Sequence, residues 1–174
     1  MIGAEKSHLF LVGFMGSGKS TVAETIAARS GRPHVDLDRE IEKRNGRTIA
    51  ELFSKDGEEQ FRRVETKTLA TIVKMPPSIV STGGGAFAGV GNRQRMRRHG
   101  VTIWLDVALD EARQRVGSGG GRPLWQDDDP IAFRGFFERR RALYWLADIR
   151  VVTAQKTPKM VDKEILERIQ GFFD

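Results

Sequence analysis

Residues 13–21, with the sequence GFMGSGKST, combine glycines, one lysine and hydroxyl side chains between an apolar run and a helix-like segment. They match the pattern G-x-x-x-x-G-K-[ST]. Backbone N–H groups of such a loop can surround a phosphate, and the positive end of the following helix points at the same place. Lys19 would reach the β- and γ-phosphates, and the hydroxyl of Ser20 would hold Mg²⁺. The full pattern, in this context, predicts a nucleoside triphosphate site rather than an ordinary glycine turn.

Two carboxylates, Asp36 and Asp38, end a strand-like run with the sequence VDLD. Alternation along a strand would put both on one side, at the carboxyl edge where parallel sheets bind ligands. One could then orient Mg²⁺ or its waters, and the other could accept a proton from an attacking hydroxyl. Alternatively, Asp38 caps the helix that follows. The residues alone leave both readings open.

Three consecutive glycines, Gly83, Gly84 and Gly85, directly follow another strand-like run. Glycines at the end of a strand let the backbone approach a ligand closely, although they are equally typical of a simple turn. Ser81 or Thr82 stands where other phosphate-loop enzymes keep an acid that orients the metal. In this chain, a hydroxyl rather than a carboxylate would therefore orient the metal from this position.

Arginines recur far from the phosphate loop, notably Arg62, Arg122 and Arg140. The planar guanidinium group of arginine pairs well with carboxylates and phosphates. An arginine that closes on a transferred phosphoryl group lowers the electrostatic barrier to its transfer. Each of them also fits a solvated surface. Phe53 and Phe61 are likewise given the simplest interpretation, that of core residues. The histidines show no metal-ligand spacing and no nearby partner, so no role is assigned to them.

The elements that must position these residues alternate between strand-like and helical patterns. Such alternation predicts a parallel sheet with helices on both faces. The segment at about 117–129 is glycine-rich, then acidic, without periodicity, and it is interpreted as a mobile functional loop. The expected strands are 8–13, 34–37, 78–82, 101–106 and 149–153, and the expected helices are 19–30, 38–45, 48–55, 57–74, 108–116, 130–146 and 158–172.

Composition narrows the class of protein. The chain has 174 residues, 39% of them hydrophobic and 30% charged, which predicts one globular domain. No apolar run approaches the ~20 residues of a membrane helix, and the N-terminal apolar run leads straight into the phosphate loop, so we expect neither a membrane association nor a signal peptide. The absence of cysteine excludes disulfides and Cys-ligated zinc, and a cytoplasmic location is expected.

The net charge of +6 suits either nucleic acid or small anionic substrates. The basic residues form scattered clusters rather than one tail. Neither a zinc-finger spacing nor an aromatic RNA-reading motif is present. Nucleic acid is therefore not the expected partner.

Five segments in order resemble the shikimate kinase family: GFMGSGKST, DLDREIEKRNGRTIAELFSKDGEEQFRRVE, STGGGAF, RPLW and RRALY. The resemblance implies an α/β fold of the P-loop kinase type, with three α/β/α layers, a central five-stranded parallel sheet and a mobile lid. It implies a single kinase domain over 1–174, with a substrate-binding helical segment at about 38–65 and the lid at about 117–129. It also implies a monomer that transfers the γ-phosphoryl group of ATP to the 3-hydroxyl of shikimate, on the route to chorismate and the aromatic amino acids.

The same resemblance assigns the nucleotide side of the site, with ATP and Mg²⁺ as the cofactors. Lys19 would contact the transferred phosphoryl group, Ser20 would ligate Mg²⁺, and Asp36 would support the metal through water. Arg122 would reach the phosphates from the lid. The residues expected at the nucleotide are Gly16, Ser17, Gly18, Lys19, Ser20, Thr21, Arg115, Arg122 and Pro158.

On the shikimate side, the resemblance makes Asp38 the residue that holds the hydroxyls and acts as, or orients, the base. Arg62 and Arg140 would clamp the carboxylate, with Glu65 holding the arginines in place. Asp38, Lys19 and Arg122 are thus the expected catalytic residues. The residues expected at shikimate are Asp38, Arg62, Gly83, Gly84, Gly85, Arg140, Phe53 and Phe61.

Two positions depart from the family pattern: Trp125 stands where leucine is common, and Ala142 where proline is frequent. A kinase of the same fold that acts on another hydroxylated acid, such as gluconate, remains an alternative. A nucleotide-dependent switch or nucleic-acid-binding module is a second alternative, and it leaves Asp38, Arg62 and Arg140 without a role.

Overall fold

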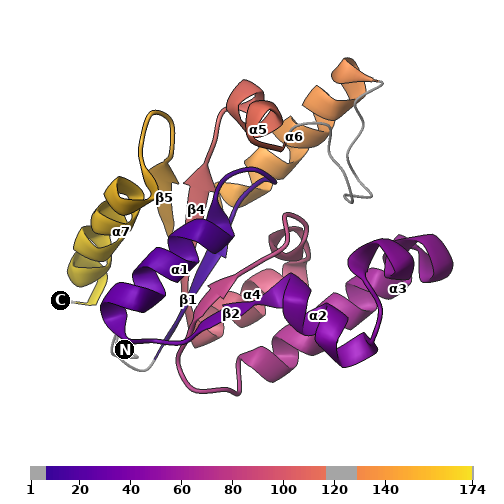
Figure 1. Cartoon of the computed structure of the whole chain (residues 1–174), viewed down its shortest axis with the longest axis horizontal. Helices are drawn as coiled ribbons and strands as arrows, with labels where there is room; N and C mark the ends of the chain where they lie inside the picture. The colour runs from indigo at the N-terminus through magenta and orange to yellow at the C-terminus, as the bar shows by residue number, and fades with distance from the viewer. Residues whose placement is uncertain (1–6, 117–128, 174) are drawn as a thin grey trace.

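The computed structural model describes residues 7–116 and 129–173 (Figure 1). Its centre is a sheet of five parallel strands, as the sequence pattern predicted. The strand order is β2-β3-β1-β4-β5. Most of the segment expected to form a lid, including Arg122 and Trp125, lies outside the described residues. The strands are β1 (His8–Val12), β2 (His34–Asp36), β3 (Ile79–Ser81), β4 (Gly100–Asp106) and β5 (Ile149–Val152).

Strand β1 lies in the middle of the sheet and is buried throughout. Its side chains alternate between two hydrophobic cores, one on each face. Leu9 and Leu11 join the core under helices α1 (Lys19–Ser30) and α7 (Pro158–Phe173). Phe10 and Val12 join the core on the opposite face.

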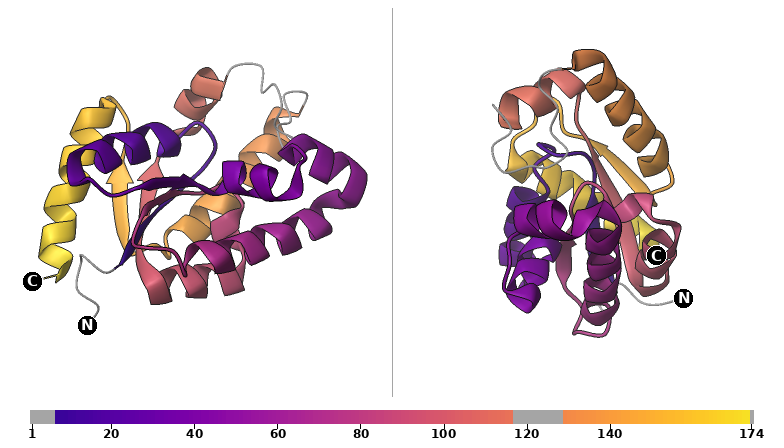
Figure 2. Two further views of the ribbon diagram at one scale, coloured as in Figure 1. Left: turned by 60° about the horizontal axis from the view of Figure 1, so that its bottom comes forward. Right: turned by 90° about the vertical axis from the view of Figure 1, so that its right-hand side faces the viewer.

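The opposite face is covered by helices α3 (Ile49–Ile72), α4 (Val90–His99) and α6 (Pro130–Tyr144) (Figure 2). Helix α6 begins at a cap in which the Asp129 side chain accepts from two backbone N–H groups, with Pro130 in its first turn. The predicted three-layer α/β/α architecture is therefore confirmed. Helix α5 (Leu109–Val116) follows β4 and stands near the phosphate loop.

Helix α2 (Leu37–Asn45) and helix α3 form an excursion between β2 and β3. A capping box of Thr48 and Glu51 starts α3. Gly57 then breaks the helical path with φ 80° and ψ 167°, a conformation that residues with side chains rarely adopt. This break separates the two helices that the sequence predicted at 48–55 and 57–74.

The structure differs from the sequence prediction at the end of β2 and at α4. Strand β2 ends at Asp36, and Leu37 already belongs to α2. Helix α4 was not predicted, because its sequence buries only Asn92 and Met96 and is otherwise dominated by charged residues, which gives almost no apolar periodicity. Within the described residues, no helix combines the length and the apolar character that crossing a membrane requires.

Candidate active site

A cavity of about 650 Å³ opens at the carboxyl ends of β1, β2 and β3. Its walls come from the phosphate loop, from α2 and α3, and from the glycines that follow β3. It therefore lies at the edge of a parallel sheet where ligands are expected. Of the predicted site residues, those that line it are Gly16, Gly18, Lys19, Ser20, Thr21, Asp36, Asp38, Phe53, Phe61, Arg62, Gly83, Gly84, Gly85 and Arg115.

The side chain of Lys19 is held by hydrogen bonds to the phosphate loop itself. The Lys19 Nζ donates to the carbonyl oxygens of Gly13 and Phe14 at 3.0 and 2.8 Å, and to Ser17 Oγ at 3.3 Å. Ser17 is buried and supports the loop from behind rather than lining the cavity. Arg115, on α5, donates to the carbonyl oxygen of Gly16 at 3.3 Å, so it lies directly over the loop.

Asp36 lies at the centre of a hydrogen-bond network in the cavity wall. Its Oδ1 accepts from the backbone N–H groups of Asp38 and Arg39 and so caps α2, while its Oδ2 accepts from the hydroxyls of Ser20 at 3.0 Å and Ser81 at 2.8 Å. Burial acts to raise the pKa of Asp36, but these hydrogen bonds outweigh it and hold the pKa below its usual value. The group is therefore a carboxylate at neutral pH.

This geometry corrects the sequence reading of the two aspartates. They do not alternate along one strand, because the strand ends at Asp36, and the helix cap is Asp36 rather than Asp38. His34, to which the sequence assigned no partner, lies behind this wall with Nε2 2.8 Å from Ser81 Oγ. Of the two hydroxyls considered at this position, that of Ser81 donates to Asp36, whereas that of Thr82 donates to the carbonyl oxygen of Leu11.

The oxygen set of Ser20 and Asp36 suits a hard cation such as Mg²⁺. No cluster of three or more His, Cys, Asp or Glu side chains able to hold a metal occurs in the part of the chain that the structure describes. An all-protein cage is not what Mg²⁺ requires beside a nucleotide, since it keeps several waters and uses phosphate oxygens.

Asp38 lies in the first turn of α2 and lines the cavity opposite the glycines. A Cβ placed on Gly83 would lie only 2.7 Å from Asp38 Oδ1, so the carboxylate is packed directly against the backbone after β3. The two predicted features, the carboxylate and the glycine run, are thus brought into contact.

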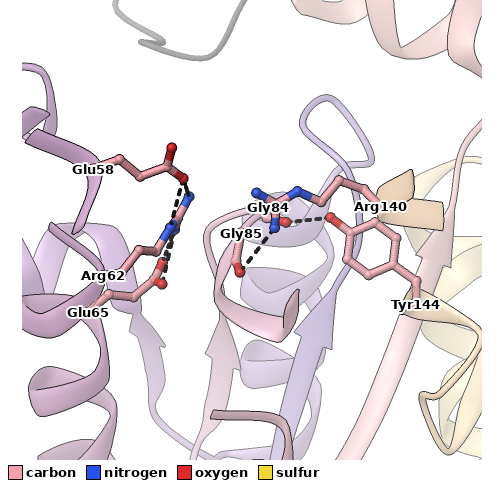
Figure 3. Close-up of polar contacts among 7 residues, drawn as sticks. All are labelled: Glu58, Arg62, Glu65, Gly84, Gly85, Arg140 and Tyr144. Carbon is pink, nitrogen blue, oxygen red and sulfur yellow. Dashed lines mark hydrogen bonds and ion pairs between the residues drawn. The ribbon is translucent and has the colours of Figure 1, made fainter. Parts of the chain in front are cut away.

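Arg62, on α3, projects toward the same glycines (Figure 3). Its Nη1 donates to both carboxylate oxygens of Glu65 at 3.0 Å, and its Nε and Nη2 donate to Glu58 Oε1 at 3.3 and 3.2 Å. A Cβ on Gly85 would collide with the guanidinium group, so only glycine permits this approach. The Phe61 ring lies 5.0 Å below the guanidinium carbon.

Arg140 reaches the glycine run from the other side, on α6. Its Nη1 donates to the carbonyl oxygen of Gly85 at 3.4 Å, and its guanidinium lies over the Phe136 ring at 5.1 Å. The hydroxyl of Tyr144, one helical turn further along, donates to the carbonyl oxygen of Gly84. Two arginines from distant helices therefore meet at Gly85 (Figure 3).

Not every predicted site residue lines the cavity. Arg140 contacts its rim through Gly85, and Pro158 begins α7 away from the cavity wall. The rings of Phe53 and Phe61 form a tilted pair with centroids 4.4 Å apart, and they line the cavity while also packing in the core. Sequence reasoning missed Glu58 and Tyr144, because neither carries a motif of its own.

Comparison with known proteins decides the family. A family model described as shikimate kinase matches residues 15–170. The chain belongs to the shikimate kinase family. It is a kinase that phosphorylates shikimate with ATP, in the pathway of aromatic amino acid biosynthesis.

Individual relatives agree with this family. The chain is 40% identical to the shikimate kinase of Sulfurihydrogenibium sp. (strain YO3AOP1) over 94% of its length and 98% of that protein. It is similar in structure to a shikimate kinase from Acinetobacter baumannii in complex with shikimate, with a TM-score of 0.91, 32% identity and coverage of 97% and 95% of the two chains. A gluconokinase from Sinorhizobium meliloti 1021 shares the fold alone, with a TM-score of 0.62, 16% identity and coverage of 97% and 94%.

Proposed function

We propose that the cavity at the sheet edge is the reaction site, with Asp38 as the group that receives the proton of the 3-hydroxyl of shikimate. The observation that carries this proposal is the position of Asp38 against Gly83, between the phosphate loop and the arginine pair. A carboxylate at that point can contact a hydroxyl of a substrate whose own carboxylate lies between Arg62 and Arg140.

The proposed reaction is an in-line transfer. The 3-oxygen of shikimate forms a bond to the γ-phosphorus of ATP as the bond from that phosphorus to the bridging oxygen of ADP breaks. The hydroxyl proton passes to an Asp38 carboxylate oxygen. Because there is little covalent work for the protein in phosphoryl transfer, positioning and charge stabilisation supply most of the rate.

Lys19 is proposed to exchange its carbonyl acceptors in the loop for phosphoryl oxygens when the nucleotide binds. Ser20 would hold Mg²⁺ directly and Asp36 would hold it through water. When bound, Mg²⁺ neutralises the charge of the phosphate oxygens. Arg115 would border the adenine, together with Pro158, and Arg122 would reach the phosphates from the segment at about 117–129.

The other wall of the site is proposed to bind the acid. Arg62 and Arg140 would each donate to the shikimate carboxylate, with Glu65 orienting Arg62. The segment at about 38–65 would form the substrate-binding wall, with Phe53 and Phe61 against the ring. We further propose that residues 1–174 form one kinase domain, active as a monomer in the cytoplasm without nucleic acid or membrane as a partner.

A coupled assay of ADP release tests this assignment. The purified chain is given ATP and Mg²⁺ with shikimate, quinate, gluconate or AMP in parallel. We expect shikimate to stimulate ADP release at least about tenfold over any other acceptor, since an acceptor that lacks or misplaces the carboxylate loses charge-assisted bonds worth about 1.5–3 kcal/mol. Equal turnover with gluconate would overturn the proposed substrate site, and ADP release that is indifferent to all four would point to a nucleotide switch.

A further inference from the structure

The guanidinium group of Arg62 has no unoccupied edge in this structure. Its Nε and Nη2 both donate to one oxygen of Glu58, at 3.3 and 3.2 Å, and its Nη1 donates to both oxygens of Glu65 at 3.0 Å. The end that carries Nη1 and Nη2 abuts the backbone of Gly85. Figure 3 shows Arg62 between the carboxylates of Glu58 and Glu65, with the glycines beside it.

One flat face of the same guanidinium group also packs against two neighbouring aromatic rings. The guanidinium carbon lies 5.0 Å from the centroid of the Phe61 ring and 5.8 Å from that of Phe53. Arginine recognises a carboxylate best through two parallel N–H donors along one edge. A substrate carboxylate can gain such an edge of Arg62 only if a present partner leaves.

Burial decides which partner can leave. The side chain of Glu65 is 2% exposed, and that of Glu58 is 52% exposed. Glu65 sits among packed neighbours of α3, whereas Glu58 follows the break in the helix at Gly57. An ion pair this exposed is weak, since each partner is well solvated when they separate. Glu58 is therefore the partner that can turn to solvent.

We propose that Glu58 is an affinity- and specificity-determining residue, which occupies the Nε–Nη2 edge of Arg62 until the carboxylate of the substrate displaces it. This inference rests on the proposed role of Arg62 as a carboxylate ligand. Glu58 and an acid substrate both present a carboxylate to Arg62. Every acid that binds to Arg62 must therefore first displace the carboxylate of Glu58. A neutral ester carries no negative charge with which to compete for Arg62, so it leaves the pair with Glu58 in place.

Two consequences distinguish this competition from a supporting role. Removing the charge of Glu58 strengthens the binding of the acid, because the edge of Arg62 is then available without displacement. It leaves the binding of the ester unchanged. The ratio of the two affinities, and therefore the discrimination between acid and ester, increases. A residue that merely holds Arg62 in place would have the opposite effect on the acid.

Calorimetric titration of shikimate and of its methyl ester into Glu58→Gln tests the proposal. Glu59→Gln is the matched control, because Glu59 forms an equivalent ion pair with Arg63, in the same turn, without touching Arg62. We expect Glu58→Gln to lower the Kd of shikimate about two- to fivefold, the range set by an exposed ion pair, and to leave that of the ester unchanged. Glu59→Gln should change neither.

An unchanged or raised Kd of shikimate in Glu58→Gln would overturn the proposal, and so would an equal gain in Glu59→Gln, which would indicate only a general charge effect. Arg62→Ala separates this failure from failure of the proposed site. If Arg62→Ala binds shikimate as the unaltered chain does, the carboxylate ligand is wrongly assigned. If Arg62→Ala binds it weakly while Glu58→Gln gains nothing, only the competition is wrong.

Discussion

Arg140 and Tyr144 lie four residues apart on α6 and hold two consecutive carbonyl groups of the glycine run, those of Gly85 and Gly84. Residues at this spacing share one face of a helix. Burial raises the pKa of Tyr144, so its hydroxyl keeps its proton and donates. Helix α6 thus fixes the peptide groups that face the proposed substrate (Figure 3).

Tyr144→Phe should weaken shikimate binding while ATP binding stays the same. The peptide between Gly84 and Gly85 is planar, so a carbonyl turned toward Tyr144 turns the Gly85 N–H to the opposite side. That N–H has no acceptor among the described residues. Loss of one such hydrogen bond costs about 1 kcal/mol, which is roughly a fivefold rise in the Kd of shikimate. Calorimetry with both ligands measures it, and equal losses for the two ligands would indicate general damage to the fold.

Arg62→Ala and Arg140→Ala should each weaken shikimate binding far more than ATP binding. A charge-assisted bond to a carboxylate contributes about 1.5–3 kcal/mol, so each change should raise the Kd of shikimate roughly ten- to hundredfold. Titration of each variant with both ligands separates the effects. Comparable losses for ATP and shikimate would contradict the assignment of these arginines to the carboxylate.

The control for Arg140 is Arg139→Ala, because Arg139 is exposed on the same helix. Arg141 is unsuitable despite its position in the same run. It lies 3.4 Å from the buried carboxylate of Asp106, which also pairs with Arg150, and so ties α6 to the end of β4. Arg139→Ala should leave both affinities within about twofold, as expected of a solvated surface residue.

Glu65 should make stability depend on pH in a defined direction. Burial raises its pKa above the ordinary value of 4.5, and Arg62 opposes this only in part. The folded chain therefore binds this proton more tightly than the unfolded chain. The contribution of Glu65 to the free energy of unfolding is then greatest below the unfolded pKa and falls as pH rises toward the folded pKa.

Urea unfolding of the unaltered chain and of Glu65→Gln, at several pH values from about 4 to about 7, checks the sign. The difference in unfolding free energy should shift in favour of Glu65→Gln as pH rises, by at most about 1.4 kcal/mol per pH unit. A difference that shifts in favour of the unaltered chain would mean that the ion pair with Arg62 outweighs burial.

The sequence predicted the fold well wherever the signal was local. Alternating apolar runs identified all the strands of the sheet, and the phosphate loop was placed correctly between β1 and α1. Helix α4 was missed because a helix that buries only Asn92 and Met96 leaves little apolar pattern to read. The sequence offered Asp38 as one alternative for the cap of α2, but the cap is Asp36, because the helix begins directly after it.

Most of the residues predicted for the site line one cavity, but the contacts that connect them were not predicted. Tyr144 is 60 residues from Gly84 in the chain, and the bond between them depends on how α6 packs on the sheet, which no local pattern encodes. The double pairing of Arg62 could not be recognised from the sequence either. Glu58 and Glu65 stand four and three residues from Arg62, and ion pairs at these spacings occur on many solvated helices. These ion pairs belong to the site only because the guanidinium group of Arg62 also lies against Gly85.

The central claim, that Asp38 receives the proton of the attacking hydroxyl, is tested most directly by Asp38→Asn in a rapid-quench single-turnover assay. Glu40→Gln, in the same turn of α2, is the control. We expect the rate of phosphoryl transfer to fall about 10²–10⁴-fold in Asp38→Asn, with the Kd of ATP nearly unchanged and Glu40→Gln close to the unaltered chain. A transfer rate above about half of the original in Asp38→Asn would contradict the claim.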